Sequence, residues 1–138
     1  MNRQIFSRLA LLVGALLAVA SVGWAKTYHM TSMTTVPGAA GEVNVAKEKN
    51  GNIQIDVNVT HLAKPGQLTP SANSYVVWFQ QEGSQPQSQG QLKIGDDLKG
   101  ELKSTTTLHH FNVIITAETD LQAKTPSDEV VLRATAQE

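Results

Sequence analysis

Apolar and polar residues alternate with a period of two along most of the chain after residue 26. The clearest run covers residues 53–60, where apolar Ile53, Ile55, Val57 and Val59 alternate with polar Gln54, Asp56, Asn58 and Thr60. Successive side chains of a strand point to opposite faces, so this run is predicted to be a strand with one buried face. The turn-forming pair Asn50-Gly51 separates it from a second alternating segment. We therefore predict an antiparallel hairpin of Glu42–Lys49 and Asn52–Leu62.

Further short strands follow at regular intervals between turn-forming residues. We predict them at Tyr28–Thr35, Ser74–Gln81, Gln91–Ile94, Glu101–Thr105, Phe111–Glu118 and Val130–Thr135. No segment shows helical spacing over two turns. About seven or eight short strands separated by turns are typical of an all-β, immunoglobulin-like antiparallel β-sandwich. Two intervening segments, Gln80–Gln91 and Thr119–Asp128, are polar and are predicted to be surface loops.

The first residues have the pattern of a cleavable secretion signal. Arg3 and Arg8 give a positive start, Leu9–Ala20 is apolar, and the small residues Gly23 and Ala25 occupy the two positions that a signal peptidase reads. A retained membrane anchor is the alternative. The uncharged stretch from Leu9 to Ala25 is, however, shorter than the roughly 20 residues that cross a bilayer. We therefore expect a helical signal peptide over residues 1–25 and cleavage after Ala25.

The remaining residues, Lys26–Glu138, are expected to form a single domain that is periplasmic or secreted. The chain contains no cysteine, so packing and sheet hydrogen bonds must stabilise this domain without disulfides. The formal net charge is only −1, which gives no long-range attraction for nucleic acid or anionic lipid. We expect no nucleic-acid partner and no membrane span after processing. A protein or another component of the cell envelope is the expected partner.

Three segments taken together resemble a known family. They are Tyr75–Phe79, then Pro86 with Gly90-Gln91-Leu92, and then Phe111–Glu118 followed by Pro126 and a closing apolar strand. In this order they resemble the extracytoplasmic C-terminal domain of bacterial anti-sigma-K-type factors, and a group of uncharacterised exported bacterial proteins built from that domain alone. The resemblance covers roughly residues 53–132 and implies a β-sandwich. No part of the sequence matches the cytoplasmic inhibitory domain of such factors, so sigma-factor binding is not expected.

The sequence contains no catalytic signature. Gly-x-Ser-x-Gly, His-Glu-x-x-His and a glycine-rich phosphate loop are all absent, and the acidic residues are spread over turns. A glycosidase, for example, needs two carboxylates that face each other across a cleft. We therefore predict that the protein is not an enzyme and that it needs no cofactor.

A soft-metal carrier is the alternative to a binding or structural module. His29, Met30 and Met33 lie near the expected mature N-terminus, and His109-His110 precedes a strand. Imidazole and thioether groups together suit copper. Adjacent residues of a strand point to opposite faces, however, so His29 and Met30 are not expected to share a ligand. We predict no metal site and retain a periplasmic copper-binding protein as the alternative function.

The preferred candidate site is the outer face of two central strands. If Tyr75, Val77 and Phe79 point into the core, Val76 and Trp78 point outward, and Ile114 does so on the strand predicted beside them. An exposed apolar cluster that contains a tryptophan usually marks a contact surface. Val76, Trp78 and Ile114 are therefore the predicted partner-binding residues. The alternative is that a loop or the N-terminal segment covers them, because a sheet covered on both faces has the same continuous apolar strands.

Overall fold

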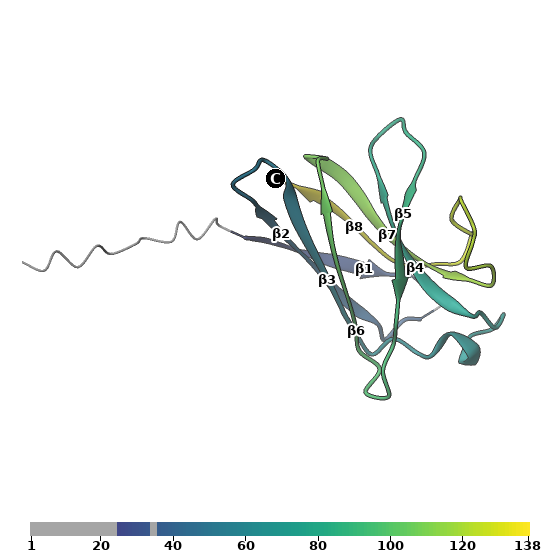
Figure 1. The fold of residues 1–138 in the computed structure, drawn as a ribbon. Helices are drawn as coiled ribbons and strands as arrows, with labels where there is room; N and C mark the ends of the chain where they lie inside the picture. Colours follow the sequence, from purple (N-terminus) through teal and green to yellow (C-terminus); the bar gives the residue numbers. More distant parts are fainter. Residues whose placement is uncertain (1–24, 34–35) are drawn as a thin grey trace, which may run out of the picture.

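The computed structural model describes residues 25–33 and 36–138 (Figure 1). The predicted signal peptide lies outside these residues, except for Ala25. The described chain forms eight strands: β1 (Lys26–Ser32), β2 (Ala40–Lys47), β3 (Ile53–Thr60), β4 (Ser74–Gln80), β5 (Gln87–Leu92), β6 (Gly100–Thr106), β7 (His110–Glu118) and β8 (Val130–Gln137). One short 3-10 turn, η1 (Pro65–Gln67), lies before β4. No helix within residues 25–33 and 36–138 is long and apolar enough to cross a membrane.

All eight strands belong to one antiparallel sheet in the order β5-β4-β7-β8-β1-β2-β3-β6. Strand β1 connects the two halves, because Lys26–Met30 pair with β2 whereas Thr31 and Ser32 pair with β8. The sheet bends at this strand, and its two halves face each other across the core (Figure 1). The prediction of an all-β fold built from seven or eight short antiparallel strands is therefore confirmed.

The predicted hairpin forms between β2 and β3. Val45 lies opposite Ile55, and the four inward apolar residues of β3 are at most 1% exposed. Burying a side chain of this kind stabilises the fold by about 1.5–3 kcal/mol. The turn contains Gly51 at a φ of 86°, and the amide of Glu48 donates to the carbonyl oxygen of Asn52 over 2.8 Å. Glycine is therefore needed at position 51, because its φ lies in the left-handed region.

The core lies between the two halves of the sheet and contains the aromatic side chains of Tyr75, Phe79 and Phe111. The rings of Phe79 and Phe111, from neighbouring parts of β4 and β7, are 5.0 Å apart between centroids and tilted by 48°. Such tilted pairs are favoured by the ring quadrupoles. The hydroxyl of Tyr75 donates to the carbonyl oxygen of Ala63 over 2.6 Å, and burial raises the pKa of Tyr75 to about 12. Tyr75 is therefore a neutral donor that fastens the segment before η1 to β4.

Strand β5 begins inside the segment that the sequence predicts to be a loop, so that part of the prediction is wrong. Its pairing with β4 shifts register, because Trp78 lies opposite Ser88 whereas Val77 lies opposite Gly90. Gln89 is the extra residue of this β-bulge, and Gly90 has a φ of 122°. A bulge with polar residues has no apolar alternation, which is why the predicted strand at Gln91–Ile94 began too late.

Gly100, the first residue of β6, is expected to tolerate no side chain. A Cβ atom there would lie 2.9 Å from the carbonyl oxygen of Lys93 and 2.8 Å from Cδ1 of Ile94, and the former is a backbone atom that has little room to move. Gly100→Ala should therefore lower the free energy of unfolding by about 1–3 kcal/mol, the usual cost of overpacking.

The matched control is Gly66→Ala in η1, because a Cβ atom there would meet nothing within 4 Å. Urea unfolding of the two variants beside the parent protein gives the comparison. Equal midpoints for Gly100→Ala and Gly66→Ala would show that the close approach at Gly100 does not exist.

Candidate functional site

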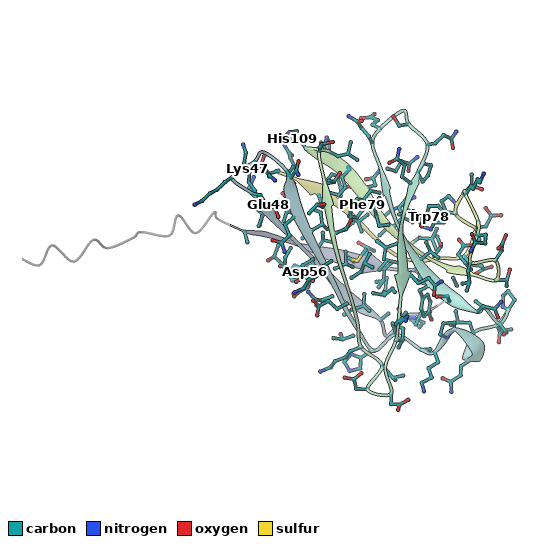
Figure 2. The ribbon with its side chains drawn as sticks, viewed as in Figure 1. Lys47, Glu48, Asp56, Trp78, Phe79 and His109 are labelled. Carbon is teal, nitrogen blue, oxygen red and sulfur yellow. The ribbon has the colours of Figure 1, made fainter. Side chains whose placement is uncertain are left out.

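The structure brings the three predicted contact residues together. Strands β4 and β7 are neighbours, and Trp78 lies directly opposite Ile114. Val76, Trp78 and Ile114 form an apolar cluster that is separate from the main core, on the outer face of the sheet. Figure 2 shows Phe79 on the core side of β4 and Trp78 on the opposite side. The predicted grouping of these side chains is confirmed.

The predicted exposure of this cluster is wrong. Val76, Trp78 and Ile114 are only 4%, 0% and 3% exposed, and Val130 at the start of β8 packs against them. Chain on the outer face therefore covers the cluster, which is the alternative that the sequence left open. A contact role for these residues stays a prediction, and it would require the cover to move.

A line of hydrogen bonds links the cluster to the segment between β7 and β8. The indole Nε1 of Trp78 donates to Oγ1 of Thr116 over 2.8 Å, and Thr116 in turn donates to Oε1 of Glu118 over 2.6 Å. The same carboxylate oxygen accepts the backbone N–H of Ser127 over 2.8 Å. The segment between β7 and β8 is thus held against β7 at Ser127. Buried polar groups that are satisfied in this way fix one arrangement, because a lost partner is costly.

The side chains considered for a soft-metal site do not come together. His29 is exposed, and its Nδ1 lies 3.6 Å from Oε1 of Glu42, whereas Met30 is buried and faces Gly41. These neighbours point to opposite faces, as predicted. Met33 is 39% exposed, and His109 lies 3.3 Å from Glu138. Across residues 25–33 and 36–138, no three His, Asp or Glu side chains are grouped as metal ligands.

The two edge strands of the sheet, β5 and β6, face each other without joining. They are the two ends of the strand order, and no backbone ladder between them is formed in the described part of the chain. Figure 1 shows both strands leaving the connection at residues 93–99 and separating toward their other ends. The hydroxyl of Ser104 bridges them by donating to Oε1 of Gln89 over 2.9 Å. Gln89, the extra residue of the bulge, thus provides the acceptor of the hydrogen bond that links β5 to β6.

At their separated ends these strands border a pocket that we call the β5–β6 opening. It is lined by uncharged hydrogen-bonding residues, namely Asn52, Gln87, Gln89, Thr105, Thr106 and Thr107. Amide and hydroxyl groups donate and accept hydrogen bonds but do not titrate near neutral pH. The opening is therefore equipped to bind a polar, uncharged ligand, and its lining has no group for proton transfer.

The burial of β6 shows that the sheet is not sealed at this opening. Its alternate residues Leu102, Ser104 and Thr106 are half-buried, whereas the corresponding residues of the neighbouring β3 are at most 1% exposed. Two of these three positions carry hydroxyl groups instead of apolar side chains. The interior of the fold thus becomes polar and accessible where β5 and β6 separate.

The opening could not be found from titratable, soft or apolar side chains, because its lining contains none of these. The available signal was the loss of apolar alternation in two segments, the Gln- and Ser-rich Gln87–Gln91 and the hydroxyl run Ser104–Thr107. Segments of this kind are usually surface loops. Only strand pairing shows that they are the two edges of one sheet.

No protein-family model matches the chain, and searches of curated proteins and of solved structures gave no match. The resemblance to the outer domain of anti-sigma-K-type factors therefore stays a prediction from the quoted residues.

Removing the hydroxyl of Thr116 should weaken the covered cluster. Thr116 is 0% exposed, and Thr116→Val would remove the acceptor of Trp78 Nε1 and the donor to Glu118 together. We expect the free energy of unfolding to fall by about 1–3 kcal/mol, the cost of leaving a buried polar group without a partner.

Thr135→Val is the matched control, because Thr135 donates to Asn112 over 2.8 Å at an exposed site where water can replace the lost partner. Denaturant unfolding, followed by circular dichroism, measures both. If Thr135→Val lowers the free energy of unfolding as much as Thr116→Val does, the buried hydrogen bonds of Thr116 contribute no more to stability than an exposed hydrogen bond.

Proposed function

We propose that the chain is an exported, non-catalytic binding module whose recognition surface is the β5–β6 opening. The proposal includes secretion to the periplasm or beyond, supported by the secretion pattern of residues 1–25. It also includes an immunoglobulin-like arrangement of the two halves of the sheet, supported by the central pairing of β4 with β7.

The observation that carries the proposal is the polar lining of the opening between two edges that do not pair. Unpaired edges are normally covered or blocked, because exposed backbone groups promote aggregation. Here a single side-chain hydrogen bond, from Ser104 to Gln89, bridges the strands, and beyond it the lining is made of amides and hydroxyls. A site of this composition suits recognition through hydrogen bonds.

The chemistry of the lining supports binding without catalysis. General acid–base catalysis uses a group whose pKa can be set near the working pH, such as a carboxyl or an imidazole. The residues that border the opening are Asn, Gln and Thr. A soft-metal carrier is not proposed, because the side chains of His29 and Met30 lie on opposite faces of β1.

The covered cluster has a supporting role in this proposal. Trp78 lies on β4, directly opposite Ser88 of β5. By fixing β4 through its hydrogen bond to Thr116, the cluster also fixes the strand that forms one side of the opening. Val76, Trp78 and Ile114 would therefore act on binding through the position of β5, without contacting the partner in this arrangement.

Site-specific photo-crosslinking in cells that express the full chain tests this proposal. A photoreactive residue in place of Thr105, which is exposed at the opening, is compared with one in place of Thr27, which is exposed on β1. We expect a discrete crosslinked product in the envelope fraction from position 105 only, and protein in that fraction that begins at Lys26. Equal crosslinking from both positions would overturn the choice of site, and unprocessed protein in the cytosol would overturn export.

A further inference from the structure

We propose that the β5–β6 opening binds a short extended polypeptide segment, which adds to the free edge of β6 as one more antiparallel strand. This inference rests on the proposed function and specifies the chemical class of its partner. Three features of the structure support it: the regularity of β6, the position of the opening along this strand, and the absence of charge in the lining.

Strand β6 provides a regular edge. It pairs with β3 from Gly100 to Thr106 without a register shift, so its other edge presents evenly ordered backbone N–H and C=O groups. In an antiparallel strand these groups point alternately to the two sides, and those on the side away from β3 meet no ladder. An added strand would pair with them, as in recognition by strand addition. Strand β5 is less suitable because its bulge interrupts the pattern.

The position of the opening limits where such a strand can pair. Near Gly100 the strands are crowded, because a Cβ atom there would already approach Leu92 and Ile94. Farther along, a Cβ atom at Gly90 would contact Leu102, and Gln89 is hydrogen-bonded to Ser104. The added segment therefore enters beyond Ser104, where it pairs with Thr105 and Thr106 at the end of β6 and runs past the bend at Thr107, and it leaves the Gln89–Ser104 bridge in place.

The lining also selects the side chains of the partner. Those that face into the opening would meet the amides of Asn52, Gln87 and Gln89, and none of the lining residues could pair with a buried charge. Burying an unpaired charge is very costly. The partner is therefore an extended segment whose inward side chains are small and uncharged, such as Ser, Thr, Ala or Val.

A carbohydrate would use the same amides and hydroxyls, but strand addition is favoured by the structure. The opening is bordered by the free backbone edge at the end of β6, with which a peptide backbone can pair and which a sugar would leave unpaired. A peptide backbone instead matches the spacing of that edge along the strand. Sugar binding is therefore an outcome of the experiment and not the proposal.

The test uses a panel of capped octapeptides in which Ser, Thr, Ala and Val fill alternate positions. Each peptide is made in three forms: unmodified, with the amide nitrogens of the odd residues methylated, and with those of the even residues methylated. Methylation removes the backbone donors of one edge and keeps every side chain. Binding to the purified protein is followed by amide chemical-shift changes in a two-dimensional NMR spectrum.

We expect the amide chemical-shift changes to be centred on Thr105–Thr107. One methylated form only should lose affinity, by about tenfold or more, because only one edge of the peptide pairs with β6. Thr107→Glu should weaken binding by a similar factor, because a carboxylate at the opening would have to be desolvated. Thr119→Glu is the matched control, exposed and outside the opening, and should bind as the parent does.

The remaining outcomes separate this inference from the proposed function. If a peptide binds at the opening and both methylated forms bind equally well, strand addition is overturned while the opening remains a binding site. If no peptide of the panel shifts Thr105–Thr107, or if only simple sugars do so, strand addition is likewise overturned. The crosslinking from position 105 still decides the proposed function independently.

Discussion

Backbone pairing governs this structure, because every strand must place its N–H and C=O groups in a ladder or leave them at an edge. Seven successive pairings join the eight strands into one antiparallel sheet, and the sheet bends at β1 so that its halves enclose the core. The bend brings the two edges, β5 and β6, toward each other. Complete closure would have removed both edges. Instead they meet at the connection 93–99 and separate beyond it, as Figure 1 shows.

The packing of side chains follows from this incomplete closure. Where the halves of the sheet face each other, alternate residues of β3 are almost completely buried and apolar. Beside the opening, Ser104 and Thr106 replace apolar side chains, since water can reach them. The bulge at Gln89 has two effects. It bends β5, and it places the side-chain amide of Gln89 where its oxygen accepts the hydrogen bond from Ser104. The outer face of β4 and β7 is sealed separately, by Val130 and by the hydrogen-bond line that ends at Ser127.

How much could be predicted from the sequence depended on which interaction determined each element. The period of two located β2, β3 and β8, because one face of each is buried by apolar contact, whereas continuous apolar segments located β4 and β7, which are buried on both faces. The same rule put Val76, Trp78 and Ile114 on one outer face, which is confirmed. Alternation cannot show whether a face of the sheet is covered, however, so the burial of this cluster could not be foreseen. The first part of β5, residues 87–90, was missed because backbone pairing and a bulge define it, and neither leaves an apolar pattern.

Amide hydrogen exchange, resolved by residue, tests the incomplete closure of the sheet most directly. Slow exchange requires an amide that is paired in a stable ladder. Strand β7 pairs on both sides, so its central amides should all exchange slowly. In β6, from Ser104 to Thr106, we predict that the amides directed toward β3 exchange slowly and those directed toward the opening exchange quickly. Uniformly slow exchange along β6 would contradict this account, because it would show that β5 and β6 are joined and that the sheet is closed.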